Sequence, residues 1–418
     1  MDAQKYAIRK VVGLPGASIR ILLEQAKNSA FITAMAIAVA ITIFLVILYV
    51  GVPGVFKVLT GDERDKLTGA LLSGLMWGGM YSIIALGMVV VYKATRVLNM
   101  AAGGMLQFLT FLAWWLLAVG DNQSFVLIVL FLVIALMAIR ITNRGQAGQF
   151  GITLGICLVI GAGVVLWGGL NGDYLSYWQV RIVGLIILTF AAVVFGLFSD
   201  RLVFRGMIGA NPLMTFMLAV FFGFLFLHGL CVLVFEGKSQ IMPQLFPSGT
   251  IAVGNYKLPW DLLWAFIVGT VLFLVFVIFF RFTKTGLAMR CVSENSVVSQ
   301  SLGIYVKRVY SIAWVVGALT ATIGGILLAT KTAVYSESGG MGNYALFRAL
   351  PVMILGGLES IGGCFLAALI VGLAEQCSGA YIDPYIPQFR AIMPYVLLLV
   401  IIVIRPHGLF GLKGIRRI

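Results

Sequence analysis

The chain has 418 residues, of which 61% are hydrophobic and 11% are charged, and its mean hydropathy is +1.06. This composition leaves too little polar surface to cover a soluble globule and excludes an enzyme that is merely anchored to a membrane. The formal net charge of +14 does not indicate nucleic-acid binding, because Lys and Arg lie in short loops between apolar runs rather than on one stripe. We expect no nucleic-acid partner.

Apolar runs of about 20 residues, each long enough to cross a hydrocarbon core of about 30 Å, recur along most of the chain. The predicted fold class is all-α, a polytopic transmembrane helical bundle. The candidate spans before the last stretch of the chain are 31–56, 69–92, 100–118, 125–139, 150–170, 180–200, 211–236, 261–281 and 309–331.

The N-terminal 27 residues mix Lys and Arg with Ile and Leu around Pro15. This pattern is typical of a helix lying on the inner membrane surface, and a disordered basic tail is the alternative. The run 31–56 is longer than the apolar part of a signal peptide and lacks a clear small-residue cleavage site, so we expect it to stay as a helix. The predicted divisions are an amphipathic segment plus an extra helix over 1–68, a main transmembrane domain over 69–411, and a basic tail over 412–418.

On the positive-inside rule, a cytoplasmic N-terminus places alternate loops in the cytoplasm. The loops rich in Lys and Arg are 93–96, 140–144, 201–205 and 281–308. This alternation places residues 332–344 outside. For the basic tail to be cytoplasmic as well, the number of crossings after residue 344 must therefore be odd. Two short, half-length helices flanking 357–362 and a span over 391–404 give this result and about twelve crossings in all. A re-entrant hairpin over 345–360 would instead leave the C-terminus outside.

Two features mark the first helix pair of the main domain. Gly74 and Gly78 stand four residues apart, a spacing that lets a neighbouring helix approach closely. Tyr81 and Asn99 bring polar atoms to the ends of this pair. Ordinary helix packing explains the glycines, whereas for Asn99 a packing role and a functional role both remain open.

The loop 281–308 is too polar to cross a membrane. Thr285 and the residues after it are expected to cap a short cytoplasmic helix that continues to about Ser301. The apolar residues expected on one face of this helix are Leu287, Cys291 and Val298. Arg290 and Glu294, at i and i+4, add opposite charges beside that face, a pattern suited to docking on a soluble partner. A solvated loop containing an incidental helix is the alternative.

Near the C-terminal end, one membrane-length apolar run is interrupted by pairs of glycines, with Glu359 between them. Each unpaired backbone amide in hydrocarbon costs several kcal/mol, so a broken helix survives at membrane depth only where protein or a water-filled path surrounds it. The break therefore indicates a transport protein. The other ionisable residues near membrane depth are Glu236, Arg348, Glu375 and Arg390, with His228 the one intramembrane histidine. Most of them lie near span ends, where snorkelling or an interfacial position explains them.

Several chemistries have no support in the sequence. The five cysteines, Cys157, Cys231, Cys291, Cys364 and Cys377, show no CxxC spacing, so we expect neither disulfides nor a metal site. No GxxxxGK[ST] phosphate loop, HExxH or GxSxG motif occurs, so this chain is not expected to hydrolyse ATP or to act as an enzyme.

The motifs in chain order are Gly74, Gly78, Tyr81, Ala85, Leu86, Gly87 and Asn99; TKTGLAMR, Glu294 and SLGI; LGGLESIGG; Glu375; and RPHGLFG at 405–411. Together they resemble the permease subunits of the branched-chain amino acid (leucine/isoleucine/valine) ABC importers. The resemblance covers 69–118 and roughly 180–411. Residues 1–68 and about 120–178 look like additions, the second an inserted helix pair, that would bind an accessory subunit or lipid.

The resemblance implies a permease in the cytoplasmic membrane of a bacterium or archaeon, with no cofactor of its own. It would pair with a like or sister permease, bind two cytoplasmic ABC ATPase subunits, and receive substrate from an external solute-binding protein. The ATPase-coupling residues that it implies are Thr285, Gly286, Arg290, Glu294, Asn295 and Gly303. The substrate path that it implies runs past Tyr81, Asn99, Gly356, Gly357, Glu359 and Ser360.

The chain departs from the family pattern in ways that bear on the substrate. Where the family commonly has Asn-Phe-Ala-His-Gly-Glu, residues 99–104 read NMAAGG, and Glu359 and Gly362 replace a usual glycine and proline. Family members also transport urea, short amides and small organic acids, so these classes stay open beside branched-chain amino acids. The alternative function is an ion-coupled secondary transporter with Glu359 or Glu375 as a proton site.

Overall fold

The computed structural model describes residues 61–119, 177–207, 210–235, 238–243, 245, 249–253, 256–336, 340–405 and 408–410. The chain divides into two compact units, and nearly all of the described residues belong to the second, Asp65–Ile418. The predicted surface helix, the spans 31–56, 125–139 and 150–170, and the tail 412–418 lie outside the described residues.

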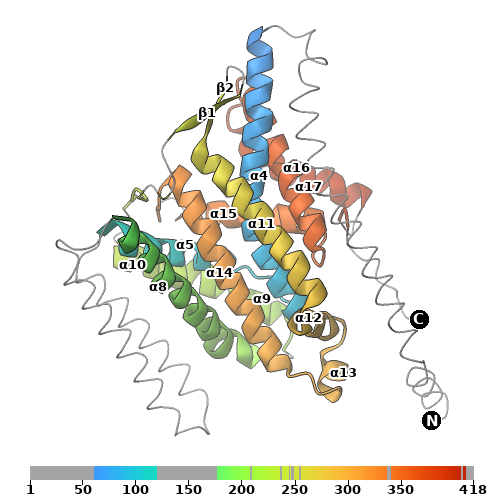
Figure 1. Cartoon of the computed structure of the whole chain (residues 1–418). Coiled ribbons are helices and arrows are strands. Elements are labelled where there is room, and N and C mark those ends of the chain that lie inside the picture. The colour runs from blue at the N-terminus through green and yellow to red at the C-terminus, as the bar shows by residue number, and fades with distance from the viewer. Residues whose placement is uncertain are drawn as a thin grey trace. The chain divides into compact units, whose positions relative to one another are not determined.

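The described part is built almost entirely of helices (Figure 1). In chain order the elements are α4 (Gly61–Thr95), α5 (Ala102–Trp114), η3 (Trp115–Val119), α8 (Tyr177–Phe198), η5 (Ser199–Phe204), η6 (Arg205–Met207), α9 (Pro212–Val220), η7 (Phe221–Leu227), α10 (His228–Phe235), β1 (Thr250–Val253), β2 (Tyr256–Pro259), α11 (Trp260–Phe282), α12 (Lys284–Glu294), α13 (Ser296–Ser301), α14 (Val306–Thr332), α15 (Gly340–Gly356), α16 (Ile361–Tyr381) and α17 (Phe389–Ile404).

The predicted all-α class and the multi-pass membrane architecture are confirmed. Within the described residues the named strands are β1 and β2, which form one antiparallel hairpin. Six helical stretches there are long and apolar enough to cross a membrane: Asp65–Thr95, Gly184–Met207, Leu213–Phe235, Trp260–Phe282, Val306–Thr332 and Ile361–Tyr381. Two shorter apolar helices, Ala102–Leu117 and Phe389–Ile404, match the predicted spans 100–118 and 391–404.

The core lies around α4, α5 and α14. Helix α5 is buried along its length and packs against α14 and α15, while α14 packs against α8, and α16 packs against both α15 and α17 (Figure 1). Helices α9, α10, α11 and α17 instead leave many Leu, Ile, Val and Phe side chains exposed. Helices that are apolar all round suit this outer position, because the surroundings are lipid or further protein rather than water.

Close contact between α4 and α16 confirms the prediction made from the glycine spacing. A Cβ at Gly74 would lie 2.7 Å from the Cα of Leu373, and a Cβ at Gly78 would lie 2.8 Å from the carbonyl oxygen of Ala368. Since real Cβ atoms do not approach backbone this closely, both glycines are needed for the two helices to pack at this distance.

The predicted break is present, but only one of its two helices is short. Helix α15 has 17 residues, and Gly357 follows it with a φ of +94° that favours glycine. Ser360 then caps α16, its Oγ accepting a hydrogen bond from the Gly363 N–H at 3.0 Å. Because this cap starts the new helix at once, the second glycine pair lies inside the first turn of α16, which has 21 residues. The expectation of two half-length helices is therefore wrong for α16.

Candidate functional site

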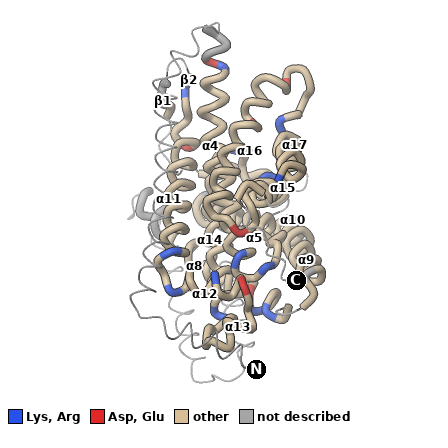
Figure 2. Tube along the Cα trace, turned by 90° about the vertical axis from the view of Figure 1, so that its right-hand side faces the viewer, with Lys and Arg blue, Asp and Glu red and all other residues tan. Residues whose placement is uncertain are grey.

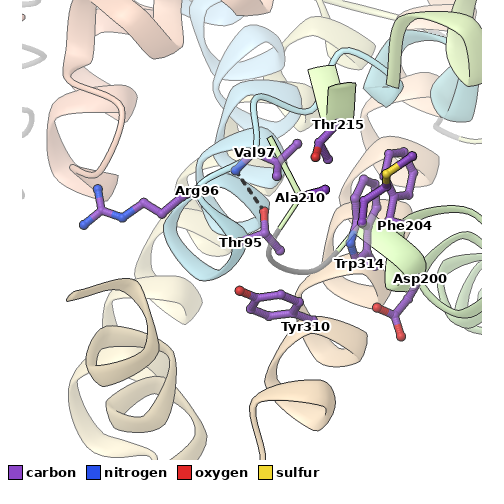
Figure 3. A pocket seen from close by; sticks show the side chains of 10 residues that line it. Thr95, Arg96, Val97, Asp200, Phe204, Ala210, Thr215, Tyr310 and Trp314 are labelled. Carbon is purple, nitrogen blue, oxygen red and sulfur yellow. Dashed lines mark hydrogen bonds between the residues drawn. The ribbon is translucent and has the colours of Figure 1, made fainter. Parts of the chain in front are cut away.

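A cavity of about 210 Å³ lies where α4 ends, between η5, the start of α9 and the start of α14 (Figure 3). Its lining residues are Thr95, Arg96, Val97, Asp200, Phe204, Met207, Ala210, Thr215, Tyr310 and Trp314. They come from three stretches that are far apart in the sequence, 95–97, 200–215 and 310–314, so the cavity depends on the packing of several helices.

The cavity wall is apolar and carries hydroxyl groups. The rings of Phe204 and Trp314 stack with their centroids 3.9 Å apart. The Thr95 hydroxyl donates to the carbonyl of Val91 at 2.8 Å and accepts from the Val97 N–H at 3.2 Å. Figure 3 shows the Arg96 side chain turned away from the group formed by Thr215, Phe204 and Tyr310. A wall of this kind suits a small solute with an apolar part better than a strongly charged one.

A buried carboxylate holds one side of this cavity in place. Asp200 is 1% exposed, and its Oδ2 accepts hydrogen bonds from Arg205 at 2.6 Å and from the Ser311 hydroxyl at 2.7 Å. The arginine neutralises the buried charge, and the serine ties η5 to α14. The sequence analysis does not single out Asp200. The signal that could have found it is an acidic residue at the end of the apolar run 180–200, followed by arginines.

Arg96 joins the end of α4 to two other elements. Its Nε donates to the carbonyl of Ser293 in α12 at 2.7 Å, and its guanidinium forms an ion pair with Glu359 in the turn between α15 and α16. The Lys93 ammonium donates to the Glu359 backbone carbonyl at 3.2 Å. Of the residues predicted on the substrate path, Gly357, Glu359 and Ser360 belong to this turn, and Gly356 ends α15 directly before it.

The ion pair contributes little to stability. The Arg96 and Glu359 side chains are 44% and 27% exposed, and exposed pairs are typically worth about 0.2–1 kcal/mol. Arg96 has a left-handed φ of 60°, a conformation that costs a non-glycine residue roughly 1–2 kcal/mol. The ion pair does not offset the cost of the left-handed conformation. Residues held in strained conformations by their surroundings are common at functional sites.

The other two path residues lie apart from the turn. Asn99 is 1% exposed between α4 and α5, and its Oδ1 has no hydrogen-bond partner in the described part of the chain. Tyr81 lies roughly 20 Å from the end of α4, at ~1.5 Å per residue. The structure therefore does not bring Tyr81 together with Glu359. An unpaired buried amide oxygen such as Oδ1 of Asn99 is uncommon and suggests a role beyond packing.

Tyr81 belongs to a buried ionic network. Its hydroxyl donates to Oε2 of Glu375 at 2.8 Å, and Arg348 Nε donates to Oε1 of the same carboxylate at 3.1 Å. Glu375 is fully buried, and the Arg348 guanidinium lies 3.6 Å from the ring centroid of Tyr344. The expectation that Arg348 and Glu375 snorkel at span ends is wrong, because each finds its partner inside the bundle.

The short polar helix predicted in the loop 281–308 is present as two helices. The cap is Thr283, whose Oγ1 accepts from the Gly286 N–H at 2.9 Å, and not Thr285, which lies within α12. Asn295 ends α12 and caps α13 by accepting from the Val297 and Val298 N–H groups at 3.0 and 3.1 Å. The expectation of one helix capped at Thr285 is therefore wrong, because Asn295 adopts an extended backbone that starts a second helix.

Helices α12 and α13 have one face on the bundle and one face exposed. Gly286, Met289 and Val292 are buried, and a Cβ at Gly286 would lie 2.6 Å from the Cα of Phe280 in α11. The exposed face carries apolar and charged side chains: Leu287, Arg290, Glu294, Val297, Val298 and Leu302. Cys291 and Thr285 are half-buried, and Gly303 is exposed with a φ of +83° where the chain turns into α14. Figure 2 shows Lys and Arg gathered at this end.

Comparison with known proteins decides between the transport classes. The family described as the permease component of the branched-chain amino acid transport system matches residues 143–403. The chain belongs to this family. The permease is 25% identical to the high-affinity branched-chain amino acid transport system permease protein LivH of Escherichia coli K12 over 353 residues, 83% of this chain and 96% of LivH.

Two further relatives extend the comparison. The permease is 24% identical over 352 residues to BraD of Pseudomonas aeruginosa, a permease protein of the same description, covering 83% of this chain and 97% of BraD. It is also 25% identical over 142 residues, 32% of this chain and 44% of the relative, to a probable LivH of Methanocaldococcus jannaschii. These relatives support an ABC importer permease and do not favour the ion-coupled alternative.

The corrected cap of α12 gives a testable prediction. Thr283→Ala removes the acceptor for the Gly286 N–H and should cost about 1 kcal/mol of local helix stability. Hydrogen exchange of the backbone amides in the first turn of α12 should then speed up about fivefold, the factor for 1 kcal/mol. Thr285→Ala is the matched control and should leave those amides unchanged. A faster exchange in Thr285→Ala than in Thr283→Ala would show that the assigned cap is wrong.

Proposed function

We propose that this permease is the membrane subunit of an ATP-driven importer and that α12 and α13 are its docking site for cytoplasmic ABC ATPase subunits. Two observations support the docking site. Helices α12 and α13 have only 11 and 6 residues and are polar, so they do not cross the membrane, yet they connect the membrane-length helices α11 and α14. Their outward face combines apolar side chains with the opposite charges of Arg290 and Glu294.

The proposed assembly follows from this docking site. Two ATPase subunits bind a pair of permeases, identical or homologous, and ATP hydrolysis belongs to the ATPase subunits. Closure of the ATPase dimer displaces α12 and α13, and the permease pair changes between outward and inward openings. An external solute-binding protein delivers the substrate to the opposite side. The permease lies in the cytoplasmic membrane of a bacterium or archaeon. The end of the bundle that carries α12 and α13 faces the cytoplasm, and so do both chain termini.

The proposed substrate is a branched-chain amino acid, the class named in the descriptions of LivH and BraD. The aromatic stack of Phe204 and Trp314 gives the cavity an apolar wall that fits an aliphatic side chain. The substrate path borders this cavity, the unpaired Oδ1 of Asn99 and the turn that contains Gly357 and Glu359. Tyr81 acts further along α4 through its hydrogen bond with Glu375.

Charge reversal at Glu294 tests the docking site. Glu294 is exposed on α12, so Glu294→Lys should leave the permease folded while placing two positive charges, with Arg290, on the docking face. We expect ATP-driven uptake to fall at least about tenfold, the effect of ~1.4 kcal/mol of lost interaction, and co-purification of the ATPase subunits to weaken.

Lys257→Glu, an exposed charge reversal in β2 at the other end of α11, is the control and should keep wild-type ATPase association. Wild-type uptake and wild-type ATPase association in Glu294→Lys would contradict the proposed docking site.

A further inference from the structure

One side chain, that of Arg96 directly after α4, connects the docking helices to the turn between α15 and α16. Arg96 Nε donates to the carbonyl of Ser293, in the last turn of α12, at 2.7 Å. The guanidinium of the same residue pairs with Glu359. Arginine suits this position because its planar fork offers separate donors to two acceptors at once, whereas a lysine ammonium is a single charged centre. A displacement of Ser293 therefore acts on Glu359 through one rigid group.

The backbone of this arginine also forms part of the cavity wall. Thr95, Arg96 and Val97 line the cavity, while the guanidinium extends to the opposite side, toward α12 and the turn (Figure 3). Arg96 directly follows α4 and has a left-handed φ of 60°. This conformation lets its side chain extend toward α12 while its backbone borders the cavity. A force applied to the guanidinium is thus transmitted to the residues that border the cavity.

The turn at Glu359 is suited to movement. Gly357, with a φ of +94°, joins the two helices. Hinges are a few residues at the ends of helices that absorb large changes in φ and ψ, and the turn 357–360 lies at such a place. Because the Arg96–Glu359 pair is partly exposed, it can break and re-form without leaving an unpaired charge in a dry interior.

We propose that Arg96 is a positioning residue that couples displacement of α12 to the α15–α16 turn and to the wall of the cavity. This inference rests on the proposed function, since an ATPase supplies the displacement. ATP-driven closure then changes the cavity through the contacts of Arg96 with Ser293 and Glu359, and loss of these contacts lets ATP be hydrolysed without transport.

The test is the number of ATP molecules hydrolysed per solute imported, measured with the permease and its partner subunits in proteoliposomes. Arg96→Glu should raise this ratio roughly tenfold, within the range typical of coupling between two sites. The double variant Arg96→Glu/Glu359→Arg re-forms the pair with the charges exchanged but has no donor for the Ser293 carbonyl, so its ratio should stay above that of the wild type. Arg96→Lys should lie between wild type and Arg96→Glu, since it keeps the charge but not the planar fork that reaches two separated acceptors.

Glu359→Gln is the second test, in case Arg96→Glu does not assemble with the partner subunits. It removes the charge from a partly exposed turn and leaves the Lys93 contact with the backbone carbonyl, so it should assemble normally and raise the ratio. A wild-type ratio in assembled Arg96→Glu, in the assembled double variant or in Glu359→Gln would overturn the proposal. If uptake by the wild type still requires ATP, the proposed function as an importer permease is unaffected by those results. Uptake by the wild type without ATP would overturn both the proposed function and the role of Arg96.

Discussion

Replacing Arg348 with alanine should lower the free energy of unfolding by about 3–5 kcal/mol, the usual cost of removing one partner of a buried ion pair. Glu375 is fully buried and accepts from Arg348 at 3.1 Å and from Tyr81 at 2.8 Å. Without the arginine, one hydrogen bond from a neutral hydroxyl remains to balance a buried carboxylate. The measurement is denaturant unfolding of the purified permease in detergent micelles.

Two further variants separate the charge effect from simple loss of contacts. Tyr81→Phe removes one hydrogen bond to a charged group and should cost about 1.5–3 kcal/mol. The double variant Arg348→Met/Glu375→Met removes both charges and should be much less destabilised than Arg348→Ala, since apolar replacements of buried pairs are often neutral or stabilising. A double variant less stable than Arg348→Ala would contradict this account of the network.

Alanine at Gly78 should destabilise the permease by about 2–3 kcal/mol, the upper part of the range for overpacked cores. The added Cβ would lie 2.8 Å from the carbonyl oxygen of Ala368 and 2.8 Å from the Cα of Leu369. Both are backbone atoms of α16, so relief requires the whole helix to shift rather than one side chain to rotate.

Gly229→Ala in α10 is the matched control for Gly78→Ala. No described atom lies within 4 Å of a Cβ built at Gly229, so the same substitution there should be neutral or raise stability by up to about 1 kcal/mol through helix propensity. Unfolding in the same detergent compares the two variants. Equal effects at the two positions would show that close packing of α4 on α16 is not what requires glycine at position 78.

The sequence predicts local features of this permease well. Apolar runs locate α4, α11 and α14, because a run of membrane length is needed to satisfy the backbone in lipid. The spacing of Gly74 and Gly78 predicts a close helix contact, although not that the partner is α16. The cap of α12 is misplaced by two residues, because two threonines stand near the end of α11 and the choice depends on where that helix stops.

The contacts that matter most for the candidate site lie beyond the reach of local patterns. Tyr81 and Glu375 are 294 positions apart in the sequence, and Arg96 and Glu359 are 263 apart. No periodicity relates residues at such separations, so a carboxylate in an apolar run can be recognised while its partner cannot. For this reason the sequence assigns Glu375 to a span end, whereas the fold buries it beside Arg348.

ATP dependence of uptake tests the central claim most directly. The permease is purified from its native membrane in mild detergent with its associated subunits and reconstituted into liposomes with a radiolabelled branched-chain amino acid outside. If the chain is an importer permease coupled through α12 and α13, an ATPase co-purifies, uptake stops without ATP, and uptake continues when ionophores collapse all ion gradients. Uptake by the chain alone that needs an ion gradient and no ATP would contradict the account.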